Sequence, residues 1–215
     1  MESYEKSDSG WIMAKTPDCV DPGVPTYVIG QNDLDLAQRL IKAGPEHRKF
    51  MRQIFVCVDI TAPIYWWNEF DTYQVGTTRN STSKMHKIAT TPITIDCFET
   101  DDLSPNIEVS RVGDAFYDWI GVLECLRVSY LKTKDKRYWK ELIRLLPESW
   151  LQRRTVTMTY ENVYSIIRQR RGHKLTEWSG MDEIDTPSFM KFAHSLPYSD
   201  KLLFLGLEPS RKEAA

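Results

Sequence analysis

The sequence contains no long hydrophobic run. No stretch approaches the ~18 consecutive apolar residues of a membrane-spanning helix, and the first ten residues, MESYEKSDSG, lack the apolar core of a secretion signal. These two absences predict a cytoplasmic protein with no membrane partner.

Cysteine and net charge are also low. The four cysteines (Cys19, Cys57, Cys97 and Cys125) form no Cys-x-x-Cys pair and have no histidines at zinc-ligand spacing. We therefore expect free thiols in a reducing compartment and no metal site. A formal net charge of −2 argues against general binding to nucleic acid. Repeats and low-complexity segments are absent as well, so the 215 residues are expected to form one domain, 1–215.

Apolar periodicity predicts both strands and helices. Residues 1–31 contain three prolines and are expected to be mostly extended, whereas Asn32 is expected to cap a helix. The expected strands are Trp11–Ala14, Pro25–Ile29, a buried strand at Gln53–Ile60, and Thr155–Thr159. The expected helices are Leu34–Ile41, Ile64–Gln74, Arg111–Leu131, Asp135–Leu146 and Pro187–Leu196.

The most unusual stretch is Ala62–His86, APIYWWNEFDTYQVGTTRNSTSKMH, directly after the predicted buried strand. Aromatic residues decorate two faces of its expected helix. From Arg79 onward, nearly every side chain can donate a hydrogen bond. Such a run suits a phosphate or a polar heterocycle, and it is equally typical of an ordinary surface loop.

A second informative stretch is Asn162–Trp178, where apolar residues at helical spacing precede three arginines. At least one guanidinium group must lie near the buried side, and it then needs an anion. That anion is either a ligand or an internal carboxylate such as Glu177 or Asp71. His173 and Glu177 are four residues apart, a spacing that fits a hydrogen-bonded pair or proton relay on one helix face.

These stretches resemble the flavin-dependent thymidylate synthases, which methylate dUMP using methylenetetrahydrofolate and a reduced flavin. The first match runs from helix Leu34–Ile41 through His47 to the aromatic helix. There the family carries a glutamine, an Arg-His-Arg group and a Ser-x-Asn-Glu-x-Ser-x-Arg-Tyr signature. The corresponding residues here are Glu69, Thr72-Tyr73-Gln74 and the segment from Asn80 to His86, in which Asn80 and Ser83 are kept.

The second match runs from Leu146-Pro147 to Trp178 and is similar to the family's Arg-x-x-Leu-Pro segment with its following helix. Arg170 falls on an arginine that holds the nucleotide, and Arg144 lies within one residue of the other. Two flavin ligands of the family, an asparagine and an arginine, are replaced by Thr159 and Glu161.

The resemblance implies an α+β fold, an antiparallel sheet with packed helices, in a homotetramer whose sites lie at subunit junctions. It implies a dUMP-like pyrimidine nucleotide as substrate, FAD as cofactor and methylenetetrahydrofolate as co-substrate. The catalytic residues it implies are Ser83, Arg170 and His47. The implied cofactor-binding residues are His47, Glu69, Tyr73, Gln74 and Ser165, and the implied substrate-binding residues are Arg144, Arg170, Asn80, Ser83, His86 and His173.

Two functions stay open at this point. The first is a divergent pyrimidine nucleotide methyltransferase or hydroxymethyltransferase, favoured by the polar and aromatic residues kept in both stretches. The second is a nucleotide-binding or scaffolding homologue without flavin, favoured by the missing Arg-His-Arg group. Candidates to replace the missing cations are Arg79, Lys84, His86, Arg168 and Arg171.

Overall fold

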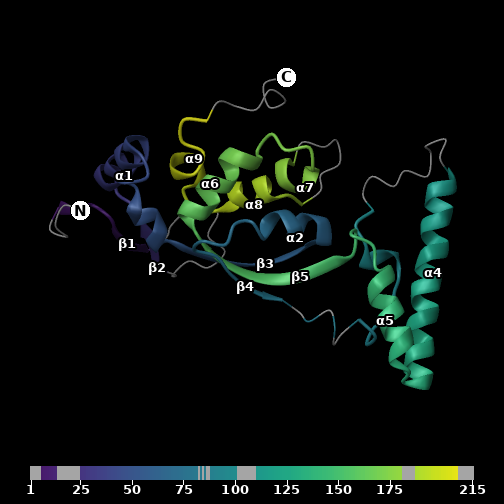
Figure 1. Ribbon diagram of the computed structural model, residues 1–215. Coiled ribbons are helices and arrows are strands. Elements are labelled where there is room, and N and C mark those ends of the chain that lie inside the picture. Colours follow the sequence, from purple (N-terminus) through teal and green to yellow (C-terminus); the bar gives the residue numbers. More distant parts are fainter. Residues whose placement is uncertain are drawn as a thin grey trace.

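The centre of the molecule is a three-stranded antiparallel sheet with strand order β3-β5-β4, and helices α2, α6 and α8 lie over one of its faces (Figure 1). The computed structural model describes residues 6–13, 25–81, 83, 85, 88–100, 110–180 and 187–207. Its strands are β1 (Gly10–Met13), β2 (Pro25–Val28), β3 (Phe55–Pro63), β4 (Thr78–Ser81) and β5 (Leu151–Thr159). Its helices are α1 (Gln31–Ala43), α2 (Ile64–Phe70), α4 (Ser110–Thr133), α5 (Lys136–Leu145), α6 (Tyr160–Arg170), α7 (Thr176–Ser179), α8 (Phe189–Ser195) and α9 (Ser199–Leu202), with short 3₁₀ helices at Lys49–Gln53 and Ile95–Cys97.

Strand β3 pairs along its whole length with β5, from Phe55 opposite Thr159 to Pro63 opposite Leu151. It has no partner on its other side among the described residues, so it is an edge strand. Its side chains alternate between buried and exposed, with Val56 buried and Phe55 in solvent. The prediction of a buried strand is therefore wrong for one of its two faces, because an apolar run does not show whether both faces of a sheet are covered.

The core under the helices is unusually aromatic. Trp66, Trp67 and Phe70 of α2 are all buried, and Trp178 of α7 stacks on Trp66 with 4.4 Å between ring centroids. Both decorated faces of α2 are thus packed. The helix ends at Phe70, four residues before the predicted end, because a turn follows in which Gly76 adopts a φ of +77° that glycine tolerates best.

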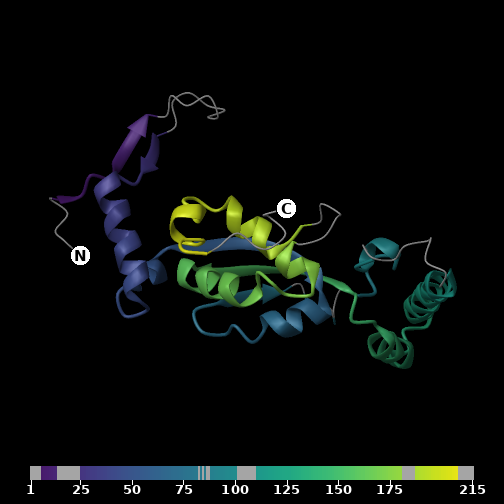
Figure 2. The same cartoon turned by 90° about the horizontal axis from the view of Figure 1, so that it is seen from above.

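A second apolar cluster joins α4 and α5 at one end of the molecule, away from α6 (Figures 1 and 2). Ile120 and Leu123 of α4 are buried there against Leu142 of α5. Trp119 lies at the rim and is 37% exposed, and its Nε1 donates to the Leu145 carbonyl at 3.1 Å.

The β1–β2 hairpin and α1 lie at the opposite end (Figure 2). Helix α1 is capped by Gly30 and not by Asn32 as predicted. The carboxylate of Asp8 accepts hydrogen bonds from the backbone N–H groups of Asn32 and Asp33, at 2.9 and 3.1 Å. A distant side chain thus does what a cap residue would do locally.

Cys57, Cys97 and Cys125 are free thiols, as predicted, and Cys19 lies outside the described residues. Within the described part of the chain, no helix is both long and apolar enough to cross a bilayer.

Candidate functional site

Glu69, on the last turn of α2, is the centre of a polar cluster with residues from α6 and the segment after it. Its Oε2 accepts from Arg170 Nη1 at 2.7 Å and from Trp178 Nε1 at 2.9 Å, and His173 Nε2 lies 3.6 Å away. Tyr73 completes the set, because its hydroxyl accepts from Arg170 Nε at 2.9 Å. We call these five residues the Glu69 cluster.

The Arg170 guanidinium is held on several sides. It lies over the rings of Trp178 and Tyr73, with 5.0 and 5.7 Å to the centroids, and its side chain is only 18% exposed. The guanidinium lies near the core because Val163, Ile166 and Ile167 are buried and fix which face of α6 packs inward. The prediction of an inward arginine is confirmed, and its internal anion is Glu69 instead of Glu177 or Asp71.

The other oxygen of Glu69, Oε1, has no hydrogen-bond partner among the described residues, and the side chain is 32% exposed. A ligand can therefore reach it. His173 Nδ1 accepts a hydrogen bond from the Leu175 backbone N–H at 3.2 Å, so neutral His173 carries its proton on Nε2, the nitrogen nearest Glu69. The cluster offers one open acceptor flanked by donors.

The predicted pairing of His173 with Glu177 on one helix face was wrong. Helix α6 ends at Arg170 and α7 begins at Thr176, so no helix connects the two residues. Glu177 instead accepts a hydrogen bond from the Tyr65 hydroxyl. Burial first, and then this carboxylate, raise the pKa of Tyr65 far above its usual range.

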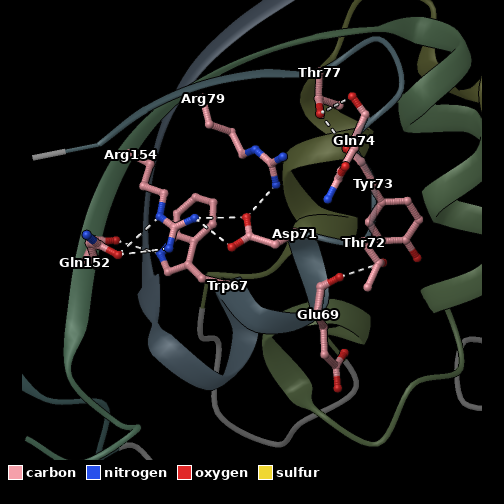
Figure 3. Close-up of polar contacts among 10 residues, drawn as sticks. All are labelled: Trp67, Glu69, Asp71, Thr72, Tyr73, Gln74, Thr77, Arg79, Gln152 and Arg154. Atoms are coloured by element: carbon pink, nitrogen blue, oxygen red, sulfur yellow. Dashed lines mark hydrogen bonds and ion pairs between the residues drawn. The ribbon is translucent and has the colours of Figure 1, made fainter.

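Asp71 forms a second polar group on the opposite side of α2 from Glu69 (Figure 3). Its carboxylate bridges Arg79 of β4 and Arg154 of β5, the latter at 3.0 Å from Nη1. Arg154 also donates to Gln152 and lies over the Trp67 ring at 4.3 Å. Two partly buried arginines thus share one carboxylate, and Nε and Nη2 of Arg79 have no partner among the described residues.

Several residues implied by the resemblance lie outside the cluster. His47 is exposed in the turn before the 3₁₀ helix at Lys49–Gln53. Arg144 is exposed on α5 at the far end of the molecule and pairs with Glu141 at 2.6 Å. Ser165, on α6, accepts from Gln169 Nε2 at 3.2 Å.

Residues of the segment that corresponds to the family signature, and Gln74 before it, also lie outside the Glu69 cluster. Gln74 is exposed in the turn after α2, Asn80 is exposed on β4, and Ser83 is exposed two residues beyond that strand. His86 and Lys84 lie outside the described residues. Within one chain, the structure therefore brings together Glu69, Tyr73, Arg170 and His173, and it does not bring the other predicted residues that are described to them.

The two replaced flavin positions serve internal roles. The Thr159 side chain accepts from the Asn162 backbone N–H at 3.3 Å, and Asn162 Oδ1 accepts from the Thr159 backbone N–H at 3.0 Å, which is a capping box at the start of α6. Glu161 forms a bidentate ion pair with Arg48, at 2.9 Å from Nε, and raises the pKa of that arginine. No local signal in the sequence marks a partner of Arg48 that is 113 residues away.

Arg168 was a candidate to replace a missing cation, and in the structure it makes hydrogen bonds within the chain. Its Nη1 and Nη2 donate to the carbonyls of Leu203 and Leu205, each at 3.0 Å, and its guanidinium stacks on Tyr164. Burial lowers its pKa. Arg168 thus anchors the segment after α9 to α6.

Comparisons with known proteins complete this description. No family model and no curated protein matches the sequence. A crystal structure of flavin-dependent thymidylate synthase ThyX from Helicobacter pylori with FAD and dUMP matches with a TM-score of 0.58 and 14% identity, over 82% of this chain and 83% of that chain. A second structure of Thymidylate Synthase X from the same organism, also with FAD and dUMP, gives 0.59 and 15% over the same shares. The resemblance seen in the motifs is confirmed at the level of the fold: this chain has the α+β fold of the flavin-dependent thymidylate synthases.

Proposed function

We propose that the chain binds a dUMP-like pyrimidine deoxynucleotide at the Glu69 cluster. The observation that carries the proposal is the open Oε1 of Glu69, set beside Arg170 and His173, whose side chains donate. The fold is that of proteins whose structures contain dUMP.

The hydrogen-bonding pattern of the cluster suits uracil. One edge of uracil presents a carbonyl oxygen, an N–H group and a second carbonyl oxygen. A carboxylate between two donors complements that edge, because it accepts from the N–H while the donors reach the carbonyls. Cytosine lacks this N–H and carries an amino group in place of one carbonyl, so it would leave buried polar groups mismatched.

Two forms of this function are proposed. In the first, the chain is a divergent transferase that adds a methyl or hydroxymethyl group from methylenetetrahydrofolate to the base, with FAD supplying redox chemistry. In the second, it binds the nucleotide without flavin, as a regulatory or scaffolding protein.

One observation favours the second form. At the family's flavin positions, Glu161 is a carboxylate and the Thr159 side chain is engaged in capping α6, so neither residue fits a flavin diphosphate. Glu69 adds negative charge where the family carries a glutamine, and Thr72-Tyr73-Gln74, which carry no positive charge, replace its Arg-His-Arg group. Any FAD would need other cations, of which Arg79 has unpaired N–H groups.

We also propose a cytoplasmic homo-oligomer, a tetramer by the resemblance. Helix α4 exposes five large apolar side chains, which is unusual for a helix that stays in solvent. These side chains are Val112, Tyr117, Trp119, Val122 and Leu131. An oligomer would also allow Arg144 of one copy to approach the Glu69 cluster of another. Light scattering at micromolar concentration tests this, and a monomer would contradict it.

The test of nucleotide binding is calorimetric titration with dUMP and dCMP. We expect dUMP to bind at least about tenfold more tightly, since one unpaired buried polar group costs ~1–3 kcal/mol. Glu69→Gln should reduce that preference, because an amide can turn either its donor or its acceptor to the base. Asp35→Asn on α1, an exposed carboxylate away from the cluster, is the matched control. Equal affinities of the wild-type protein for the two nucleotides, or no binding of either, would refute the proposal.

The visible absorbance spectrum of the protein with FAD, with and without dUMP, then separates the two forms. A bound-flavin spectrum supports the transferase. A spectrum identical to that of free FAD, in a protein that binds dUMP, supports the form without flavin.

A further inference from the structure

A cavity of about 370 Å³ lies at the other end of α2, between β3, the start of α2, α7 and α8. Its walls are mainly apolar and aromatic, with Trp66, Phe98, Phe189 and Phe192 among them. No residue of the Glu69 cluster lines it. The size and apolar lining are those of small-molecule sites in proteins.

The charged side chains that line this cavity are all acidic among the described residues. Asp59, Glu99 and Glu177 line it, and no lysine, arginine or histidine is among the described residues that do. Asp59 is neutralised by an ion pair with Arg153. Glu177 is different, because its hydrogen bond comes from the neutral Tyr65 hydroxyl and no ion pair to it is formed within the described residues.

Tyr65 links two of these carboxylates. Its hydroxyl donates to Glu177 and lies 3.4 Å from Glu99 Oε2. A hydroxyl has one proton, so it serves one carboxylate at a time, and it adds no positive charge to offset Glu177. The negative charge of Glu177 therefore lies at the edge of an apolar space, where the low dielectric strengthens its attraction for a cation.

We propose that this cavity binds a small organic cation, a primary amine or amidine on a flat apolar body. The ammonium or amidinium group pairs with Glu177, and the apolar body packs among the aromatic walls, which also favour a cation at their faces. This site is separate from the nucleotide site and does not depend on it.

The test is calorimetric titration of the whole protein with three probes of similar size and different charge: 2-phenylethylamine, 2-phenylethanol and phenylacetate. We expect the amine to bind, the alcohol to bind about tenfold more weakly, and phenylacetate not to bind, since a charge-assisted hydrogen bond contributes ~1.5–3 kcal/mol. Equal binding of the three probes, or no binding of the amine at millimolar concentration, would overturn the proposal whatever the variants do.

Variants then locate the site. Glu177→Gln keeps an acceptor for Tyr65 and should weaken the amine about tenfold while leaving the alcohol unchanged. Glu141→Gln, remote on α5, should change neither. Ile60→Trp, at a half-buried position of β3 on the face that carries the helices and lines the cavity, should abolish binding of both probes. If the amine binds equally to folded wild-type, Glu177→Gln and Ile60→Trp proteins, the cavity is not its site. Should Glu177→Gln fail to fold, Ile60→Trp and the probe series decide the matter.

Discussion

Glu69 should stabilise the fold as well as bind a ligand, and its contribution to the free energy of unfolding can be measured in the absence of any ligand. Replacing it by alanine removes the acceptor of the Trp178 indole N–H, in a side chain with no exposed surface, and the ion pair of Arg170. An unsatisfied buried donor costs about 1–3 kcal/mol. A partly exposed ion pair adds up to about 1 kcal/mol.

The sum predicts that Glu69→Ala lowers the free energy of unfolding by roughly 3 kcal/mol. For a chain of this length, each kcal/mol shifts the melting temperature by about 2–4 °C, so the expected shift is about 6–12 °C. Glu69→Gln keeps an oxygen for Trp178 and loses only the charge, and we expect a loss of about 1 kcal/mol.

Thermal and urea unfolding followed by circular dichroism provide the measurement. Glu141→Ala removes a carboxylate from an exposed pair with Arg144 and should change stability by less than about 0.5 kcal/mol. A Glu69→Ala protein as stable as the wild type would show that the cluster contributes no net stability. A Glu69→Gln protein as unstable as Glu69→Ala would show that charge, and not the bond to Trp178, is decisive.

Three further changes test other parts of the structure. Arg127 holds the pKa of Glu124 below its usual range, so this carboxylate stabilises the fold above its unfolded-state pKa, and the stabilisation disappears as pH falls through the lower folded-state pKa. The urea midpoints of Glu124→Gln and wild type should therefore converge below about pH 4. A difference that stays constant with pH would contradict this. Thr159→Ala removes the cap of α6 and should lower the free energy of unfolding in urea by about 1 kcal/mol. An unchanged free energy of unfolding would show that the cap contributes no stability. Gly76→Ala places a methyl group 3.0 Å from Asn162 Oδ1 at a φ of +77°, and its melting temperature should fall; an unchanged value would show that this turn relaxes freely.

The elements of the fold were largely predictable because their apolar spacing is local. The apolar periodicity over Arg111–Leu131 predicted a helix that begins and ends within two residues of α4. Local spacing does not show whether other elements cover both faces of a sheet. For that reason β3 was expected to be buried, although the side chains on one of its faces are exposed.

The candidate site was predictable only in part, for a related reason. Three inward apolar residues before Arg170 place its guanidinium near the core, where it needs an anion. This inference follows from the helix alone. The identity of the anion depends on how α2 and α6 cross, since Glu69 and Arg170 are 101 residues apart. Trp178 was missed as a donor to Glu69, because its role follows from the short turn between α6 and α7 and from no pattern in the sequence.

The charges around α2 indicate how this chain departs from the family it resembles. The motif comparison places a glutamine and arginines on and after this helix in the family, whereas here the helix and the residue after it carry the acids Glu69 and Asp71. The cations come from other elements: Arg79 from β4, Arg154 from β5 and Arg170 from α6. Three arginines to two carboxylates leave an excess of one positive charge at this end of α2.

At the other end of the helix, the cavity lined by Glu99 and Glu177 has the opposite charge. The stacked pair of Trp66 and Trp178 connects the two ends, because Trp66 forms part of the cavity wall and Trp178 donates to Glu69. A nucleotide anion and an organic cation would therefore be drawn to different ends of the same short helix. If both bind, the shared tryptophan stack is the physical route by which either ligand would alter the affinity for the other, and that coupling would be equal in the two directions.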